Sequence, residues 1–250
     1  GHLSLIDHAK TECDKVIVSI FVNPKQFSAH EDLETYPRNE EQDLAMLETF
    51  GVSIAYAPPV QEIYGQDFAT RIEVGHLTEC MCGIARPGFF SGVATVVAKL
   101  LNQCAPDRAY FGEKDYQQLL VIRQLVKDLN IPSEIVGCPI IRDENGLALS
   151  SRNTYLNNQQ RQVAAALFQT LKEAARNLSK GARCREVEEW AADTLKIAGF
   201  NDVEYVDIRD EITLEKTEDI IGSKRFARIF GAASLNSTRL IDNVPVKIDA

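Results

Sequence analysis

Four short polar segments of this sequence contain the residue types that bind phosphate groups and small carboxylic acids. The first is Gly1-His2, which precedes an apolar run that predicts a helix. Glycine at a helix start lets phosphate oxygens approach the backbone N–H groups that the helix leaves unpaired, and the imidazole of His2 adds a hydrogen-bond donor. A Gly-His pair at the start of a chain is also a common tag remnant. By itself this dipeptide gives weak support for a phosphate site.

The second segment, FVNPKQF (residues 21–27), leads from an apolar strand directly into two amide side chains. Asn23 and Gln26 offer hydrogen-bond donors and acceptors without charge, which suits the recognition of hydroxyl and carboxylate groups. An Asn-Pro turn that merely ends a strand has the same pattern, and on pattern alone that turn is the commoner structure.

The third segment, FGEKDYQQ (residues 111–118), stands where a strand meets a helix. Gly112 permits close approach of the backbone to a ligand, Lys114 can contact a phosphate, and Asp115 can cap the helix. Gln118 follows three residues later and returns to the same helix face. The alternative interpretation is a solvated helix N-terminus with an incidental ion pair.

The fourth segment is Ser150-Ser151-Arg152-Asn153. Two hydroxyl groups beside a guanidinium group form a natural cradle for a polyphosphate, on a loop that can close over it. A polar linker between two domains would have the same composition, so this segment also does not decide the function alone.

Strands and helices alternate in the first half of the chain. Runs rich in β-branched residues predict the strands, and apolar residues at helical spacing predict the helices. The strands are expected at residues 14–22, 52–57, 107–111 and 135–139, and the helices at 39–50, 92–104 and 115–129. This order predicts an α/β fold with a parallel sheet, helices on both faces, and a buried strand at 14–22. Ligands of such sheets bind beyond the carboxyl ends of the strands, so the loops after Val22 and Phe111 are the places to expect chemistry.

The second half of the chain has a different order. Two amphipathic helices are expected at residues 157–177 and 185–198, followed by extended segments at 203–208 and 226–232. Consecutive helices followed by strands predict a smaller α+β domain. We place the boundary near the Asn145-Gly146 turn, which gives domains at 1–141 and 142–250.

The composition excludes several classes of protein. Lys+Arg 27 against Asp+Glu 36 gives a net charge of −9, a poor balance for binding a nucleic-acid backbone. No apolar run approaches the ~18 residues of a membrane span, and the first residues do not have the blocks of a signal peptide. The six cysteines are scattered, and Cys80-Met81-Cys82 is a weak metal motif, so reduced thiols and a cytoplasmic location are expected.

Taken together and in this order, several motifs resemble those of the pantoate–β-alanine ligase (pantothenate synthetase) family. They are GHLSLI, FVNPKQF, Tyr36-Pro37-Arg38, FGEKDYQQ, LSSRN and the late TRLIDN at residues 238–243. Independent blocks in register from residue 1 to 250 make the resemblance specific. It implies a Rossmann-like nucleotidyltransferase domain and the ATP-dependent joining of pantoate to β-alanine. The reaction would pass through a pantoyl adenylate, release AMP and pyrophosphate, use magnesium, and take place in a homodimer.

The resemblance also implies roles for individual residues. Those expected to contact ATP are His2, Gly112, Glu113, Lys114, Asp115, Ile141, Leu149, Ser150, Ser151 and Arg152. Among them His2, Lys114, Ser150 and Arg152 are the expected catalytic residues, and Ile141 would face the adenine through its backbone. Gln26 and Gln118 would bind pantoate with Asn23 beside them, and Asp43 is a weak magnesium ligand. Uncharged amides suit this pocket, because a cation would blunt the carboxylate nucleophile.

Three features depart from the family pattern. The chain begins at the glycine of the H-x-G-H motif, so we expect the natural protein to extend upstream with a first strand and a first histidine. Phe89 stands where histidine is usual, and Leu149 replaces the usual methionine, a nearly volume-conserving change.

Two alternative functions stay open on the sequence. One is a nucleotidyltransferase that acts on another small acid, and the other is a truncated, catalytically impaired module that only binds nucleotide. The leading hypothesis requires Gln26, Gln118, Lys114 and Arg152 to meet at one site, with the second domain acting as a lid that excludes water.

Overall fold

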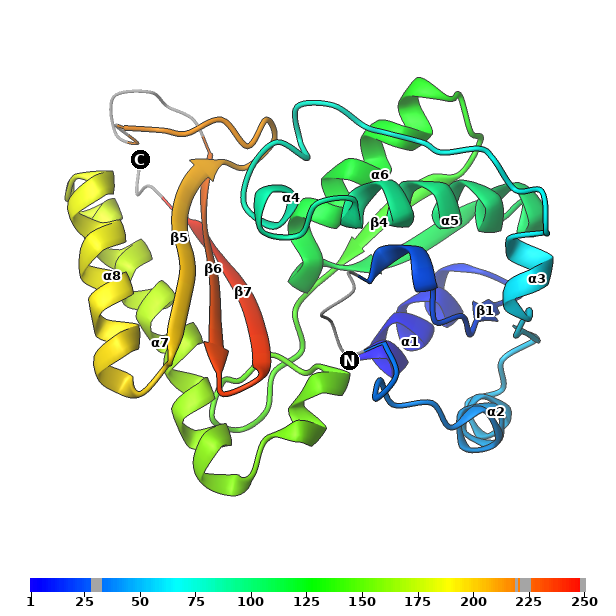
Figure 1. Ribbon diagram of the computed structural model, residues 1–250, viewed down its shortest axis with the longest axis horizontal. Coiled ribbons are helices and arrows are strands. Elements are labelled where there is room, and N and C mark those ends of the chain that lie inside the picture. The colour runs from blue at the N-terminus through cyan, green and yellow to red at the C-terminus, as the bar shows by residue number, and fades with distance from the viewer. Residues whose placement is uncertain (28–32, 219, 221–225, 248–250) are drawn as a thin grey trace. The chain divides into compact units, whose positions relative to one another are not determined.

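The computed structural model describes residues 1–27, 33–218, 220 and 226–247 (Figure 1). The chain divides into two compact units. Unit 1 contains Gly1–Glu113 and Gln117–Cys138, and unit 2 contains Lys114–Tyr116 and Pro139–Ala250. The short segment Lys114–Tyr116 therefore groups with residues that follow it by more than twenty positions.

Unit 1 alternates helices with short strands. Its helices are α1 His2–Glu12, η1 Pro24–Gln26, α2 Glu40–Thr49, α3 Val60–Ile63, α4 Cys82–Ala85, α5 Phe89–Cys104 and the greater part of α6 Tyr116–Asp128. The 3₁₀ helix η2 Glu113–Asp115 precedes α6. The strands are β1 Ile17–Ser19, β2 Ile54–Tyr56, β3 Arg108–Gly112 and β4 Glu134–Cys138. Each strand predicted in this half is present, although β1 and β2 are shorter than predicted.

The strands of unit 1 form two parallel pairs. β1 pairs with β2 and β3 pairs with β4, each through a crossover that contains at least one helix. This confirms the α/β class and the parallel pairing. The prediction that strand 14–22 is buried was wrong, since Ile17 is 38% exposed and Ile54 beside it is 54% exposed. The reason is that, in the part of the chain that the structure describes, β1 pairs with β2 alone.

Helix α5 provides the main core of unit 1. It begins at Phe89, three residues before the predicted start, because Gly88 adopts the left-handed conformation (φ 83°) that precedes the first turn. Val93, Ala94 and Leu101 of α5 are buried and pack with Ile122 and Leu125 of α6. This core fixes α5 as the platform on which the segment after β1 rests.

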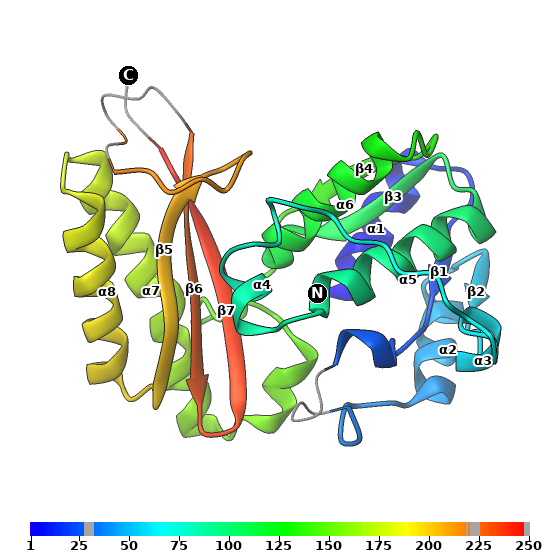
Figure 2. The same ribbon diagram turned by 45° about the horizontal axis from the view of Figure 1, so that its top comes forward.

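Unit 2 consists of two helices on one face of an antiparallel sheet. The helices are α7 Asn158–Ser179 and α8 Cys184–Ala198, preceded by the 3₁₀ helix η3 Ser151–Tyr155. The strands are β5 Asp202–Asp210, β6 Ala227–Leu235 and β7 Thr238–Val246, in the order β5-β6-β7. Figures 1 and 2 show α7 and α8 lying side by side on this sheet. The helices and the first two strands were predicted, whereas β7 was not.

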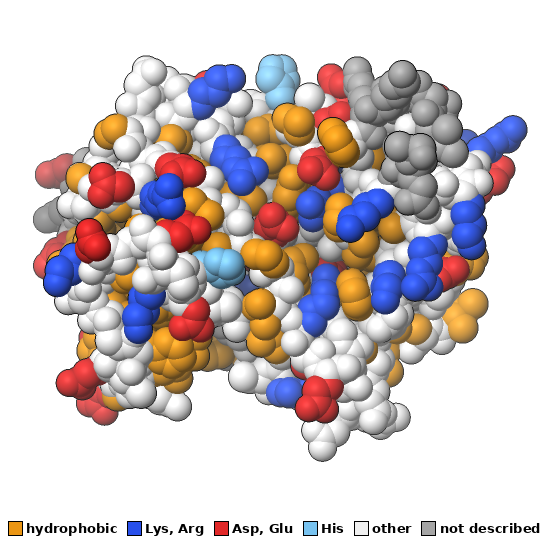
Figure 3. All heavy atoms as spheres, turned by 180° about the vertical axis from the view of Figure 1, so that it is seen from behind, with side chains coloured by type: hydrophobic (Ala, Val, Ile, Leu, Met, Phe, Trp, Pro, Cys, Tyr) orange, Lys and Arg blue, Asp and Glu red, His pale blue; other side chains and the backbone are white. Residues whose placement is uncertain are grey.

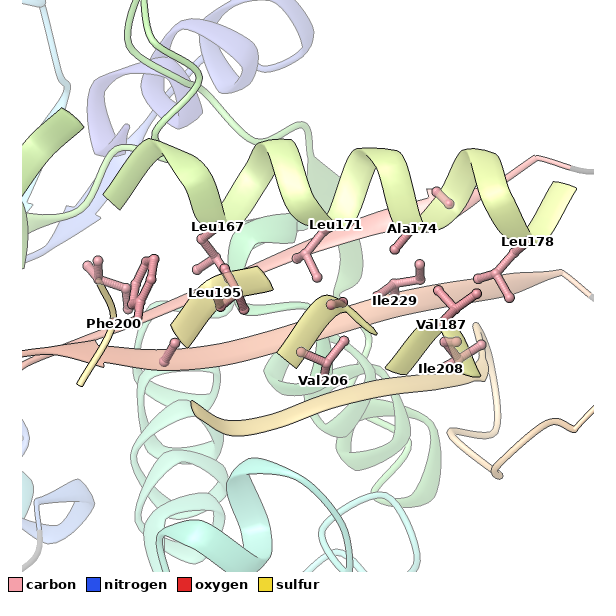
Figure 4. Packing of buried hydrophobic residues seen from close by; sticks show 14 of the residues in the cluster. Leu167, Leu171, Ala174, Leu178, Val187, Leu195, Phe200, Val206, Ile208 and Ile229 are labelled. Atoms are coloured by element: carbon pink, nitrogen blue, oxygen red, sulfur yellow. The ribbon is translucent and has the colours of Figure 1, made fainter. Parts of the chain in front are cut away.

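The core of unit 2 lies between the helices and the sheet. Leu167, Leu171 and Leu178 of α7 point toward the sheet, and Ile229 of β6 and Leu195 of α8 belong to the same core (Figure 4). A Cβ at Gly231 of β6 would lie 3.0 Å from a methyl group of Leu167. Glycine at this position therefore lets α7 lie close to the sheet.

The surface carries charged side chains of both signs. Acidic and basic side chains are interspersed over the face in Figure 3. Among the described residues, no helix has both the length and the apolar character that a membrane span needs. The six cysteines lie in the described part of the chain and form no disulfide, and four of them are buried.

Candidate active site

Asn23 is the centre of a hydrogen-bond network in the segment that follows β1. Only 2% of this residue is exposed. Its Nδ2 donates to the backbone oxygen of Gly92 at 3.0 Å and to Oε1 of Gln26 at 3.4 Å. Its Oδ1 accepts from the Tyr64 hydroxyl at 2.8 Å and from the backbone N–H of Lys25 at 3.2 Å, which caps η1. Asn23 therefore fixes Gln26 in place through neutral hydrogen bonds.

η1 rests directly on α5 at Gly92. A Cβ at this position would lie 2.3 Å from the backbone oxygen of Lys25 and 2.9 Å from the backbone nitrogen of Gln26. No side chain fits in that space, so the close approach of the two backbones requires glycine. The position of Gln26 thus depends on the absence of a side chain at residue 92.

Arg86 holds the same segment from another side. One of its Nη atoms donates to the backbone oxygen of Gln26 at 3.2 Å. Its guanidinium group lies 3.7 Å from the centroid of the Phe89 ring, in cation–π contact. Phe89 is therefore the stacking surface for a residue that supports Gln26.

Two adjacent glutamines at the start of α6 have different environments. Gln117 is buried, and its Nε2 donates to the backbone oxygens of Leu77 at 2.8 Å and Cys80 at 2.9 Å. Its Oε1 accepts from the backbone N–H of Cys82 at 3.2 Å. Gln118 is half-buried. The first glutamine therefore stabilises a loop, and only the second is accessible to a ligand from solvent.

His2 and Asp43 are exposed residues in first turns of helices. His2 is the first residue of α1, whose Ile6 and Ala9 are buried in the local core. The helix N-terminus is thereby held in place, as phosphate binding would require. Asp43 lies in the first turn of α2 with two glutamates. The described residues contain no group of three His, Cys, Asp or Glu side chains that could hold a metal ion.

The FGEKD motif spans the change from unit 1 to unit 2. Gly112 ends β3 and pairs with Cys138, and Glu113 follows it within unit 1. Lys114 belongs to unit 2, its side chain is 22% exposed, and its Nζ lies 3.7 Å from Asp115 Oδ1. A pair this exposed is weak, so it leaves Lys114 able to bind a stronger anion. The backbone oxygen of Lys114 accepts a hydrogen bond from Asn243 Nδ2 at 3.1 Å.

Ile141 and Leu149 face each other across a short hairpin. The N–H of Leu149 donates to the oxygen of Ile141 at 2.9 Å, and the turn between them contains Gly146 at a φ of 93°. Ile141 is 39% exposed and Leu149 is 37% exposed. Two apolar side chains exposed at the same end of a hairpin form a surface that suits a flat aromatic base.

The Ser150–Asn153 segment forms a fixed turn at the start of η3. Ser150 caps η3, its Oγ accepting from the backbone N–H of Arg152 at 3.3 Å. Asn153 is buried, and its Nδ2 donates to the backbone oxygen of Ala148 at 3.0 Å. Ser151 and Arg152 are half-buried. The loop is therefore anchored to the hairpin through Asn153.

The predicted site residues fall into two groups. Unit 1 contains His2, Asn23, Gln26, Asp43, Gly112, Glu113 and Gln118, and unit 2 contains Lys114, Asp115, Ile141, Leu149, Ser150, Ser151 and Arg152. The structure brings Asn23 and Gln26 together, and it also brings together Ile141, Leu149 and the Ser150 loop. The meeting of all of them at one site stays a prediction.

Four residues that hold the site segments received no role from the sequence. Arg142 forms a bidentate ion pair with Asp242, Asn243 binds Lys114, and Gly92 supports η1. Two of them could have been found from the sequence, since Asp242 and Asn243 belong to the TRLIDN motif that carries part of the family resemblance. Gly92 lies in the segment RPGFFSGV (residues 86–93) that contains Phe89, but it received no role because its importance depends on a contact with Lys25, 67 positions earlier.

Comparisons with known proteins agree with the resemblance of the motifs. The chain matches the family model described as pantoate-beta-alanine ligase over residues 1–245. The pantothenate synthetase of Roseobacter denitrificans is 47% identical over 248 residues, which are 99% of this chain and 86% of that protein. The pantothenate synthetase of Acinetobacter baylyi is 49% identical over 251 residues, 100% of this chain and 88% of that protein.

Solved structures give the same result for the fold. The pantothenate synthetase of Thermus thermophilus is 44% identical with a TM-score of 0.92, and the match covers 98% of this chain and 88% of that one. The pantoate-beta-alanine ligase from Francisella tularensis, complexed with beta-gamma ATP and beta-alanine, is 36% identical with a TM-score of 0.82. That match covers 100% of this chain and 86% of the other.

These matches do not favour an impaired module that only binds nucleotide, since the named relatives are enzymes and align along nearly the whole chain. The motifs, the α/β unit with its neutral amide network, and the full-length similarity lead to one family. The chain belongs to the pantoate–β-alanine ligases, which are ATP-dependent enzymes.

Proposed function

We propose that this chain condenses pantoate with β-alanine through a pantoyl adenylate, with the pantoate bound in unit 1 and the ATP phosphates bound by Lys114 and the Ser150 loop of unit 2. The observation that carries the proposal is the neutral network at Asn23 and Gln26, which lies beyond the carboxyl end of a parallel strand. The Francisella tularensis relative is complexed with beta-gamma ATP and beta-alanine, and we assign the same two ligand types to this chain.

The pantoate pocket consists of uncharged groups. Gln26 and Gln118 bind the hydroxyl and carboxylate groups of pantoate by hydrogen bonds, and Asn23 keeps Gln26 in position. A cation against the carboxylate would stabilise the ground state of the nucleophile and slow its attack. Neutral amides bind the same groups and leave the carboxylate reactive.

The nucleotide is held by cationic and hydroxyl groups. Lys114, Arg152 and His2 bind the phosphates with Ser150 and Ser151, and Gly112 permits close approach of the backbone. The backbone of Ile141 faces the adenine, and Leu149, its partner across the hairpin, lies beside the base. Glu113 and Asp115 flank Lys114 along the same motif.

Adenylation needs charge neutralisation and alignment of the reactants. The pantoate carboxylate oxygen forms a bond to the α-phosphorus while the bond to pyrophosphate breaks. Lys114 and Arg152 stabilise the negative charge that develops on the leaving pyrophosphate. The amine of β-alanine then attacks the acyl carbon of the adenylate, AMP leaves, and a proton is lost from the amine. The products are pantothenate, AMP and pyrophosphate.

Magnesium enters this proposal with the substrate, as MgATP. Mg²⁺ in nucleotide sites usually takes one or two carboxylates and the phosphates themselves. Asp43 would be such a carboxylate, but the described residues hold no group of three protein ligands, and we derive no step through the ion. We further propose a cytoplasmic homodimer with functional domains at 1–141 and 142–250. This division differs from the two compact units at Lys114–Tyr116 and at residues 139–141, which group with unit 2.

The test is the dependence of AMP formation on each substrate. The enzyme should release AMP from ATP only when pantoate and β-alanine are both present. Pantoate alone should support exchange of labelled pyrophosphate into ATP, since adenylation precedes the amine. Exchange with another small acid but not with pantoate would overturn the substrate assignment, and ATP binding without any exchange would overturn the reaction.

A further inference from the structure

Two adjacent residues of β7 are polar, buried and bound to segments of the proposed nucleotide site. Asp242 is 4% exposed and Asn243 is 2% exposed. The proposed function gives neither residue a contact with substrate. Buried polar side chains are costly unless they are hydrogen-bonded, so their partners indicate what they do.

Asp242 binds the hairpin that carries Ile141 and Leu149. Its two carboxylate oxygens accept from the two Nη atoms of Arg142 at 2.5 and 2.8 Å. Arg142 also donates to the backbone oxygen of Gly146 at 3.0 Å, and its guanidinium group lies 3.6 Å from the Phe168 ring centroid on α7. The hairpin is therefore fixed to the sheet and to α7 through one arginine.

Asn243 binds the backbone of the phosphate-binding lysine. Its Nδ2 donates to the backbone oxygen of Lys114 at 3.1 Å, and its Oδ1 accepts from Arg228 at 2.6 Å. The guanidinium group of Arg228 lies 3.8 Å from the ring centroid of Tyr116, two residues after Lys114. One side chain of β7 and one of β6 thus hold the segment Lys114–Tyr116 at two points.

The two contacts lie on opposite faces of the sheet. Asp242 pairs with Gly231, which faces Leu167 and Leu171 of α7. Asn243 pairs with Phe230, which lies against Tyr116 with a distance of 6.0 Å between ring centroids. Because side chains alternate along a strand, this dipeptide reaches both faces at once.

We propose that Asp242 and Asn243 are positioning residues that set the adenine-covering hairpin and the Lys114 backbone in one fixed relation through β7. This inference rests on the proposed function, since it assigns ATP to the segments that the two residues hold. A shift of about 1 Å in a group that binds phosphate costs much of its effect on the transition state. The two residues act on ATP only through Arg142 and Lys114.

The test compares Asn243→Asp with the unchanged enzyme. Aspartate keeps an acceptor for Arg228 but has no N–H to donate to the Lys114 oxygen. We expect the KM for ATP to rise about tenfold or more, because the hydrogen bond that holds the Lys114 backbone is lost. The KM for pantoate should stay within twofold. Calorimetric titration with a non-hydrolysable ATP analogue should show the same weakening without turnover.

Asp242→Asn provides the second variant, and Glu204→Gln provides the matched control. Glu204 also forms a bidentate pair, with Arg239 of β7, at 2.7 and 2.9 Å, and neither residue is among the predicted site residues. Asp242→Asn should weaken ATP binding, whereas Glu204→Gln should leave it unchanged. Thermal unfolding of each variant separates a loss of folding from a loss of positioning.

The outcomes separate a failure of the positioning role from a failure of the proposed function. Equal ATP affinity in the unchanged enzyme and in both folded variants would overturn the inference, as would an equal loss in Glu204→Gln. An unchanged enzyme without pantoate-dependent pyrophosphate exchange would overturn the proposed function, and the positioning role with it. If Asn243→Asp does not fold, the ATP affinity of Asp242→Asn is compared with that of Glu204→Gln, and equal affinities would overturn the inference.

Discussion

The two groups of site residues are held in place by different kinds of interaction. In unit 1, Gln26 is fixed by neutral hydrogen bonds from Asn23, by backbone packing at Gly92, and by one hydrogen bond from Arg86, which stacks on Phe89. In unit 2, the nucleotide segments are fixed by the Arg142–Asp242 ion pair and by guanidinium groups stacked on aromatic rings. The first arrangement relies mainly on neutral hydrogen bonds and close backbone packing, whereas the second adds a largely buried ion pair between Arg142 and Asp242. This matches the ligands proposed for each, a reactive carboxylate in one and a polyphosphate in the other.

The strongest way to test the charged side of this comparison is to remove its main cation. Lys114→Ala should lower turnover by about 10²- to 10³-fold, the usual effect of removing one group that stabilises developing charge. The fold should be retained, since the ion pair of the Lys114 side chain among the described residues is the weak one with Asp115. The measurement is the initial rate of AMP formation at saturating substrates.

Lys127→Ala serves as the control, because Lys127 is an exposed residue of the last turn of α6. A Lys114→Ala enzyme that keeps its activity within a few-fold of the parent would contradict the assignment of this lysine to the phosphates.

The neutral side is tested by Gln118→Ala. This change should raise the KM for pantoate about tenfold to a hundredfold, since a hydrogen bond to a charged group contributes roughly 1.5–3 kcal/mol. The KM for ATP should change little. Gln124→Ala, which removes an amide bound only to Asp128 on the helix surface, is the control. An unaltered pantoate KM would show that Gln118 does not contact this substrate.

Gly92→Ala tests whether shape controls the amide network. Alanine normally stabilises a helix interior by about 1 kcal/mol over glycine. Here its Cβ would overlap the Lys25 backbone, so overpacking should instead cost about 1–3 kcal/mol and displace Gln26. The checks are urea unfolding and the pantoate KM, which should rise several-fold. Gly65→Ala is the control, since a Cβ there meets nothing within 4 Å.

The smallest expected effect is a change of stability with pH in unit 1, at Tyr64, whose hydroxyl donates to Asn23. Burial raises the pKa of Tyr64 to about 12, more than the hydrogen bond to Asn23 lowers it. The unfolded chain ionises first, near pH 10, so the folded state loses stability as the pH rises from about 10 toward 12. The loss between pH 9 and 11 should be about 1 kcal/mol. Tyr64→Phe should reduce this slope in the free energy of unfolding by about that amount. The rest of the slope should remain, because burial also raises the pKa values of Tyr110, Cys104 and Cys138. A slope that is the same in Tyr64→Phe as in the parent would contradict the contribution of Tyr64.

Most helices and strands could be predicted because they depend on local pattern. The amphipathic period of residues 157–177 and 185–198 placed α7 and α8 within a few residues. The motif FVNPKQF located Asn23 and Gln26, since an amide after a strand is visible in the sequence. The resemblance of six motifs gave the family that the comparisons show.

The support of the site could not be predicted because it depends on contacts distant in the chain. Asn243 and Lys114 are 129 positions apart, and Arg142 and Asp242 are 100 apart. β7 was missed because it contains aspartate, asparagine and proline, which are depleted in strands. The exposure of β1 depends on how many strands pair with it, and the residues of the strand itself do not reveal that number.

The adjacency of Asp242 and Asn243 has a consequence for how this strand can change in length. Inserting or deleting one codon within β7 would turn each following side chain to the other face of the sheet. Asp242 and Asn243 would then lose Arg142 and Lys114 in a single event, whereas a point mutation removes one partner at a time. Natural length variation in this region should therefore be confined to the ends of the strand, or occur in steps of two residues.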